Sequence, residues 1–252
     1  MPDAKSWYKH PLMVIGAVLG GLISLLVLFF IGETIYFMIV FKLGKQKPTE
    51  PYESQALHAS IANIFNQNKA PIEQMRRLEG KGNPTLGNAS ATVHIVEFID
   101  YDCPNCLEMA PIIRSYMKDH AGDAYLVIRD FPATELHPYA VDAAVAARCV
   151  LTQGQDLYWK FHDWLFDNQG NRSADALTAG AGLVGADTQL FSDCFKKRSV
   201  ISDIELGLTD GAAFGIAGTP TFFFNGVKIE GRMMEEVFKV MVDEARKHAA
   251  AK

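Results

Sequence analysis

The sequence predicts an α/β protein in which two groups of strands are separated by a long helical block and preceded by an apolar helix. Three observations lead to this prediction. The patterns after residue 83 run strand, helix, strand, helical block, hairpin and helix. A long, almost uncharged run stands before them, near the N-terminus. With 252 residues, of which 49% are hydrophobic, the chain can bury one good core and a small accessory piece.

The predicted strands are short and rich in apolar residues. "VHIVEFI" (Val93–Ile99) is typical of a buried strand, and "YLVIRDF" (Tyr125–Phe131) predicts a second one. Two β-rich segments flank Asn225-Gly226, a dipeptide that favours a two-residue hairpin turn. We expect the chain to close with a helix over Glu235–Ala249.

Helical patterns fill most of the remaining sequence. We expect helices at about Gln55–Gln67, Pro71–Leu78 and Cys103–Asp119, and a helical block over about 137–214. Pro111 interrupts the third helix and is expected to kink it. The predicted organisation is a tail (1–10), an anchor (11–41), a tether with N-terminal helices (42–82) and a folded domain (83–252) that contains the helical block.

The apolar run Pro11–Phe41 carries a single charge, Glu33. About 20 apolar residues cross a bilayer, so the run predicts a transmembrane anchor. A cleaved signal peptide has a shorter apolar region that is followed by a small-residue cleavage site, and neither feature is present after Phe30. We therefore expect an uncleaved anchor, and a cleaved signal peptide is the alternative. The lysines before and after the run do not decide its orientation (Lys5 and Lys9; Lys42, Lys45 and Lys47).

Charge and cysteine content exclude several classes of protein. The net charge is −5, and the absence of a Lys/Arg cluster argues against a nucleic-acid partner. Four cysteines are too few to build a disulfide scaffold of this length. His137 and His162 stand alone among aromatic residues, which is more typical of structural histidines than of metal ligands.

Cys103 and Cys106 form a C-x-x-C pair directly after the first strand. Cys103 falls in the first turn of the predicted helix, where free N–H groups and the helix dipole stabilise a thiolate, so it is the candidate nucleophile. Cys106 lies one turn further on the apolar side and is the candidate resolving thiol. Pro104 suits a helix start. This exposed position argues against a purely structural disulfide.

A metal-binding module is the alternative from a different class of protein. Zinc would need two further ligands beside Cys103 and Cys106, and no second C-x-x-C or adjacent histidine pair offers them. We therefore expect no metal and no cofactor.

Six separated segments resemble the DsbA-like thiol-disulfide oxidoreductases of the thioredoxin superfamily and together span about Asn83 to Glu230. The resemblance implies a thioredoxin fold with a helical insertion, about 137–214, between its βαβ and ββα halves, here preceded by a transmembrane helix. The segments are "NPTLGNASATVHIVEFIDYDCPNC", "CLEMAPIIRSY", "IRDFP", "HPYAVDAAVAARCV", "LYWKFHDWLFDNQ" and "GIAGTPTFFFNG".

The resemblance also implies roles for individual residues. Glu97 matches an acid beneath the cysteine pair that accepts the proton of the buried thiol; the alternative is an edge-exposed or salt-bridged glutamate. Thr219-Pro220 matches a cis-proline loop beside the cysteines. Asn105 stands where the most oxidising members carry histidine.

Cys149 and Cys194 lie in the helical block. The first shares a helix face with Val141 and Val145, and the second shares one with apolar neighbours (Leu190, Phe191 and Phe195). Two inert buried thiols would fit this pattern. Because some DsbA-like members carry such a pair, the resemblance favours a structural disulfide.

The predicted function is the introduction or exchange of disulfides in proteins outside the cytoplasm. The expected partners are reduced or misoxidised extracytoplasmic proteins, and a membrane redox partner that reoxidises or reduces the dithiol. The catalytic domain is expected in the periplasm or otherwise outside the cytoplasmic membrane, because disulfides persist there. Oxidase, isomerase and reductase would share the same residues, and the choice among them stays open.

Overall fold

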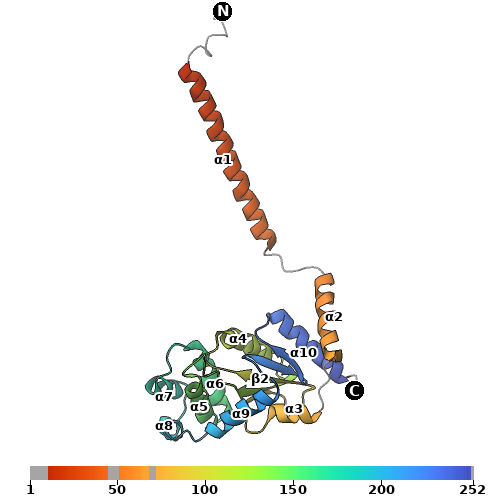
Figure 1. Ribbon diagram of the computed structural model, residues 1–252, viewed down its shortest axis with the longest axis vertical. Helices are drawn as coiled ribbons and strands as arrows, with labels where there is room; N and C mark the ends of the chain where they lie inside the picture. The colour runs from red at the N-terminus through yellow and green to blue at the C-terminus, as the bar shows by residue number, and fades with distance from the viewer. Residues whose placement is uncertain (1–10, 45–50, 68–71, 251–252) are drawn as a thin grey trace, which may run out of the picture. The chain divides into compact units, whose positions relative to one another are not determined.

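The computed structural model describes residues 11–44, 51–67 and 72–250 (Figure 1). The predicted tail (1–10) and residues 45–50 of the predicted tether lie outside these ranges. The described elements are α1 (Pro11–Gly44), α2 (Pro51–Gln67), α3 (Ile72–Glu79), β1 (Thr85–Gly87), β2 (Val93–Ile99), α4 (Pro104–Asp119), β3 (Ala124–Asp130), α5 (Ala140–Leu151), α6 (Gln155–Asp167), α7 (Ala174–Leu183), α8 (Thr188–Lys197), α9 (Ile201–Ala213), β4 (Thr221–Phe224), β5 (Val227–Glu230) and α10 (Glu235–Ala250).

The chain divides into two compact units, Met1–Ser54 and Gln55–Lys252. In the first unit, α1 exposes large apolar side chains such as Leu25 and Phe30. Within the described ranges, no helix is found that is both long enough and apolar enough to span a membrane. In the second unit, Ile61 and Phe65 of α2 are buried, and Asn66 contacts His248 of α10 (3.1 Å).

Five strands form the sheet of the second unit, in the order β1-β3-β2-β4-β5. Strands β2 and β3 are parallel and are joined through α4, while β4 and β5 pair antiparallel around Asn225-Gly226. This arrangement confirms the predicted βαβ and ββα halves.

The edge strand β1 was not predicted from the sequence. It has three residues and lies in a segment rich in Gly, Pro and Asn, so it has no periodicity of its own. It forms because it pairs antiparallel with β3 and because the backbone of Thr85 bonds two side chains of α6. Gln155 accepts from its N–H (3.1 Å), and the Trp159 indole donates to its carbonyl (2.8 Å).

The two faces of the sheet bury different sets of side chains. Ile95 and Ile99 of β2 join the larger hydrophobic cluster, which includes residues of α4 and α10. Val96 and Phe98 join a smaller cluster with Leu78 of α3. Because side chains alternate along a strand, Glu97 faces the same side as Ile95 and Ile99, toward α4.

Helices α5 to α9 form the insertion between β3 and β4, which confirms the predicted helical block. In Figure 1, α5 to α8 gather at the end of the unit away from α10. Helix α9 packs closely on β3, because Gly207 approaches the Asp130 backbone so nearly that a Cβ would come within 2.3 Å of its carbonyl oxygen.

Cys149 of α5 and Cys194 of α8 form a disulfide, as the family resemblance implied. One detail of the predicted packing is wrong. Leu190, expected on the apolar face with Cys194, is 60% exposed. The buried stripe of α8 centres on the fully buried Phe191, so its neighbour in sequence turns toward solvent.

Candidate active site

The C-x-x-C pair begins helix α4. Cys103 is the N-cap residue with an extended backbone (φ −75°, ψ 122°), and Pro104 occupies the first turn. The carbonyl of Cys103 accepts the N–H of Leu107 (3.1 Å), which starts the helical ladder. Cys106 follows one turn later and is fully buried, and both cysteines are free thiols. The predicted placement of the pair is confirmed, except that Cys103 is only 6% exposed instead of open.

The cis Thr219-Pro220 bond precedes β4 and lies against the first cysteine. The thiol of Cys103 donates to the carbonyl of Thr219 (3.2 Å). This contact joins residues 116 positions apart and contributes to the low solvent exposure of Cys103. Pro104 and Asn105 remain exposed on the outer side of the helix turn. The structure therefore brings the predicted active-site loop residues together around one sulfur.

The two thiols differ strongly in acidity. A hydrogen bond with the Cys106 thiol lowers the pKa of Cys103 to about 5, helped by the Thr219 side chain and the N–H groups of Cys106 and Asn105, while burial acts in the opposite direction. Burial, followed by the contact with Cys103, raises the pKa of Cys106 well above its ordinary value. The site thus combines an outer thiol that ionises easily with an inner thiol that holds its proton.

Glu97 is buried in the central strand, 4% exposed, between Ile128 of β3 and Phe222 of β4. Burial raises its pKa to about 8, and its charge contributes to the raised pKa of Cys106. The edge-exposed interpretation is therefore wrong. No ion pair involving Glu97 is found among the described residues, so the salt-bridged interpretation has no support either. A carboxyl group in this position can exchange a proton near neutral pH.

Asp100 has partners that its sequence position did not reveal. Its carboxylate accepts the N–H groups of Asp102 and Ala133 (both 2.9 Å), and it lies 2.7 Å from Nδ1 of His137. Its side chain is fully buried. Asp100 and Asp102 lie just before Cys103 in the sequence, where a negative charge close to the sulfur would raise the pKa of this thiol. In the structure, the Asp100 carboxylate instead contacts the His137 side chain at the start of the insertion.

Asp102 is paired with Arg172, which lies between α6 and α7 of the insertion. Nε of Arg172 donates to Asp102 Oδ1 (2.8 Å). The Gln169 amide donates to the carbonyls of Tyr101 (3.0 Å) and Cys103 (3.1 Å). Sequence reasoning did not identify Gln169 or Arg172. The "DNQ" segment after α6 was noted only as part of a family pattern, and it holds no signal for contact with residues about 70 positions away.

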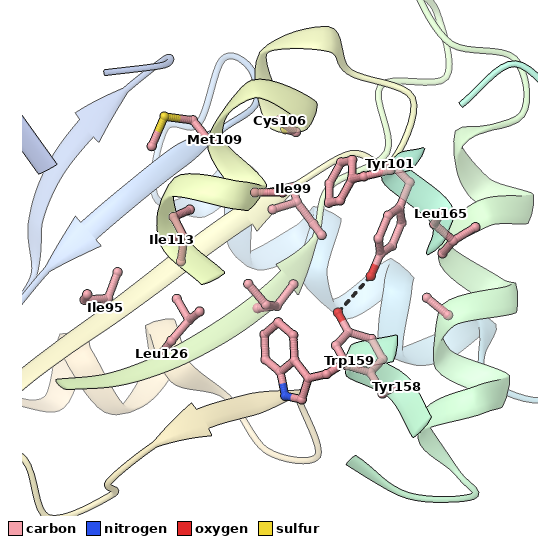
Figure 2. Packing of buried hydrophobic residues seen from close by; sticks show 14 of the residues in the cluster. Ile95, Ile99, Tyr101, Cys106, Met109, Ile113, Leu126, Tyr158, Trp159 and Leu165 are labelled. Carbon is pink, nitrogen blue, oxygen red and sulfur yellow. Dashed lines mark hydrogen bonds between the residues drawn. The ribbon is translucent and has the colours of Figure 1, made fainter. Parts of the chain in front are cut away.

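The buried aromatic side chains of α6 belong to the hydrophobic core. Tyr158 and Phe161 are buried, and the Tyr158 hydroxyl bonds that of Tyr101 at 2.8 Å (Figure 2). Figure 2 also shows Cys106, Ile99 and Tyr101 at the same end of the cluster. Burial lowers the pKa of His162, which makes it a neutral structural group. In the ranges that the structure covers, no three or more metal-binding side chains converge.

Comparisons with known proteins agree with this geometry. A family model described as thioredoxin matches residues 79–244. The thiol-disulfide exchange protein α-DsbA2 from Wolbachia pipientis superposes with a TM-score of 0.62 at 22% identity, over 75% of this chain and 97% of that one. A thioredoxin-like oxidoreductase from Silicibacter pomeroyi gives 0.62 at 27% identity, over 71% and 99%.

Curated relatives are longer than this chain. The Na⁺/H⁺ antiporter NhaA 1 of Salinispora arenicola is 28% identical over 215 residues, which are 85% of this chain and 31% of the relative. The chain spans about a third of the length of the curated relatives it matches.

A sheet with one parallel strand pair, a helix that begins at a C-x-x-C pair, and a cis-proline loop beside it define a thioredoxin-fold oxidoreductase. The family model covers more than half of the chain. The chain therefore belongs to the thioredoxin family, and it shares its fold with the thiol-disulfide exchange protein and the thioredoxin-like oxidoreductase named above.

Proposed function

We propose that this chain introduces or exchanges disulfides in protein substrates outside the cytoplasm, through the Cys103-Pro104-Asn105-Cys106 dithiol. The observation that carries the proposal is the contrast between the two thiols, since the pKa of Cys103 is lowered to about 5 and that of the buried Cys106 is raised. A thiol of low pKa, such as Cys103, is a good leaving group. A buried thiol, such as Cys106, can react only with a sulfur next to it, here that of Cys103.

In the oxidising direction, the active form carries a Cys103–Cys106 disulfide. A substrate thiolate attacks Cys103 Sγ, the S–S bond breaks, and Cys106 leaves as a thiolate that takes up a proton. A second substrate thiolate then attacks the substrate sulfur of the mixed disulfide, and Cys103 leaves as a thiolate. The substrate loses two electrons, and a membrane redox partner must remove these from the dithiol to close the cycle.

Reduction uses the same groups in the opposite order, and isomerisation begins with the same attack but ends when another substrate thiolate displaces Cys103 from the mixed disulfide. The Cys103 thiolate attacks a substrate disulfide, and Cys106 then attacks Cys103 Sγ and releases the substrate as a thiol. Cys106 must lose a proton for this step. Glu97 is the proposed acceptor in this direction and the proposed donor in the other, because its pKa of about 8 allows both charge states near neutral pH.

The Thr219-Pro220 loop is the proposed site for the substrate backbone. Its carbonyl already bonds the Cys103 thiol, so a substrate segment whose sulfur reaches Cys103 would lie along the same loop. Pro104 and Asn105 are exposed beside it and would contact the substrate as well.

We also propose that the apolar run 11–41 anchors the chain in the cytoplasmic membrane, with the catalytic domain (83–252) on the outer side and residues 42–82 as tether and N-terminal helices. The sequence supports this proposal, because the run contains one charge and, at about 1.5 Å per residue, would as a helix exceed the roughly 30 Å of a bilayer core. The Cys149–Cys194 disulfide supports an oxidising compartment.

The test of the dithiol uses two variants. Cys103→Ser should abolish oxidation of a reduced test protein, whereas Cys106→Ala should accumulate mixed disulfides at Cys103, seen on non-reducing gels. Activity that survives in Cys103→Ser would disprove the assignment. Metal bound stoichiometrically to the reduced protein, without dithiol activity, would favour the metal-binding module instead.

The test of location is protease added outside intact spheroplasts. The domain beyond residue 48 should be cleaved, and a cytoplasmic protein should not. Protection of the domain while the spheroplasts stay intact would place it in the cytoplasm and overturn the proposed topology.

A further inference from the structure

Arg172, in the segment that follows α6, bonds the two residues that precede the candidate nucleophile Cys103. The guanidinium of Arg172 donates to Asp102 (2.8 Å) and to the carbonyl of Tyr101 (3.0 Å). It also donates to the carbonyls of Leu165 of α6 (2.9 Å) and of Asn168 just after this helix (3.0 Å). Arg172 therefore ties the end of α6 to the two residues that precede Cys103.

The Arg172–Asp102 pair is almost excluded from water. The two side chains are 2% and 13% exposed. Salt and solvent screen a buried charge poorly, so removal of one partner leaves the other uncompensated. Asp102 is bonded through its backbone to Cys103, and its unpaired carboxylate would oppose formation of a thiolate there.

The other charged groups around the cysteine pair have separate partners or positions. Asp100 pairs with His137 on the insertion side, and Glu97 lies beneath Cys106 in the central strand. The Gln169 amide is neutral and holds the carbonyls on both sides of Asp102. Arg172 thus brings a guanidinium into direct contact with Tyr101 and Asp102, which we call the Cys103 loop, and the carboxylate of Asp102 is its ion-pair partner.

We propose that Arg172 is a positioning residue for the Cys103 thiolate: it neutralises Asp102 and fixes the loop, so that the N-terminus of α4 acts on the sulfur without an opposing negative charge. The inference rests on the proposed dithiol function and deepens it. It assigns to the helical insertion a part in setting the reactivity of the cysteine pair, beyond covering it.

The experiment is a thiolate titration of the reduced, full-length protein in detergent micelles, followed by absorbance at 240 nm. Arg172→Gln should raise the midpoint for Cys103 by about one pH unit, a tenfold weaker acid, because Asp102 is left unpaired. Asp102→Asn keeps an acceptor for the guanidinium but removes the negative charge, so it should lower the midpoint. The double variant should return close to the wild-type midpoint.

The matched control is Arg198→Gln. Arg198 pairs with Asp142 (2.7 Å) in the same insertion, but both side chains are about 40% exposed and neither contacts the Cys103 loop. This variant should leave the midpoint unchanged. Unchanged midpoints in both Arg172→Gln and Asp102→Asn would overturn the inference and leave Arg172 a structural role alone.

Two further results keep the outcome unambiguous. If Arg172→Gln does not fold, Asp102→Asn decides: a lower midpoint supports the inference and an unchanged one overturns it. A wild-type protein whose Cys103 neither titrates below its ordinary range nor oxidises a test protein would instead overturn the proposed function. An active wild type with unresponsive variants overturns only the part assigned to Arg172.

Discussion

Replacement of Glu97 by glutamine should make the protein more stable at neutral pH than the wild type. In the folded protein, burial raises the pKa of Glu97 from 4.5 to about 8. Between these values the unfolded chain releases the proton while the folded protein keeps it, so stability falls as pH rises. The linkage relation gives a loss of about 3 kcal/mol between pH 4 and pH 7, and about 5 kcal/mol once pH exceeds 8. Glutamine has nearly the same shape and does not ionise.

The measurement is urea unfolding of the oxidised full-length protein in detergent micelles at pH 4, 6 and 7. In the oxidised form Cys103 and Cys106 do not titrate, so they do not contribute to the pH dependence. The pKa of Glu97 is raised by burial and not by the thiols, so it should stay raised in this form. Glu97→Gln and the wild type should have similar stability at pH 4. The advantage of the variant should grow by about 3 kcal/mol by pH 7. Dithiol activity should fall in the same variant, because the proposed proton acceptor is lost.

Glu108→Gln is the control for this experiment. Its side chain is 56% exposed and pairs with Arg232 on the surface, so its removal should change stability little at any of these pH values. Parallel stability curves for Glu97→Gln and the wild type between pH 4 and pH 7 would show that Glu97 is not held neutral by burial. The proposed proton transfer would then lose its basis.

The remaining predictions concern the cysteines and the dipeptide between them. Alkylation of reduced Cys103 by iodoacetamide should rise through a midpoint near pH 5, and a midpoint near pH 8 or 9 would contradict the lowered pKa. Replacing Cys149 and Cys194 with alanine should cost about 4 kcal/mol by urea unfolding, since the bond closes a loop of 45 positions; an equally stable variant would refute this. Asn105→His should lower the pKa of Cys103 further and make the protein more oxidising, because imidazolium adds positive charge. The wild-type reduction potential should lie between about −270 and −120 mV, and a value at the upper end, or no effect of histidine, would show that Asn105 does not set it.

Local chemistry explains why much of the fold could be predicted. The hairpin turn depends on two residues with positive φ, Asn225 (48°) and Gly226 (88°), and the sequence shows both next to each other. The proposed roles of Cys103 and Cys106 depend on one helix turn, which a three-residue spacing defines. Features set by near neighbours can be recognised from the sequence because no other part of the chain needs to be placed.

The cis bond at Pro220 and the Cys149–Cys194 disulfide depend on more than near neighbours. They were expected only because separated segments resemble a known family. Composition and spacing alone would have left a trans proline and two buried thiols equally reasonable. The structure has both features: the cis bond lies in a loop that contacts Cys103 across 116 positions, and the disulfide joins residues 45 positions apart.

The sequence by itself determined the position of Glu97 in an apolar strand, but its depth was decided by the tertiary structure. Burial in the central strand, beneath α4, requires the pairing of β2 with both β3 and β4. The same holds for β1, a strand that exists because β3 and two α6 side chains satisfy its backbone. Pairing of this kind leaves no periodic signal in three residues.

The charges around the nucleophile show the same limit most clearly. The sequence places Asp100 and Asp102 beside Cys103, which alone would suggest a less acidic thiol. The folded chain brings His137 and Arg172 to these carboxylates from 37 and 70 positions away. Electrostatic interaction depends on distance in space and on burial, and neither is fixed until the insertion has packed against the sheet. The sequence therefore identified the two candidate reacting sulfurs, while the tertiary structure decided their charge environment.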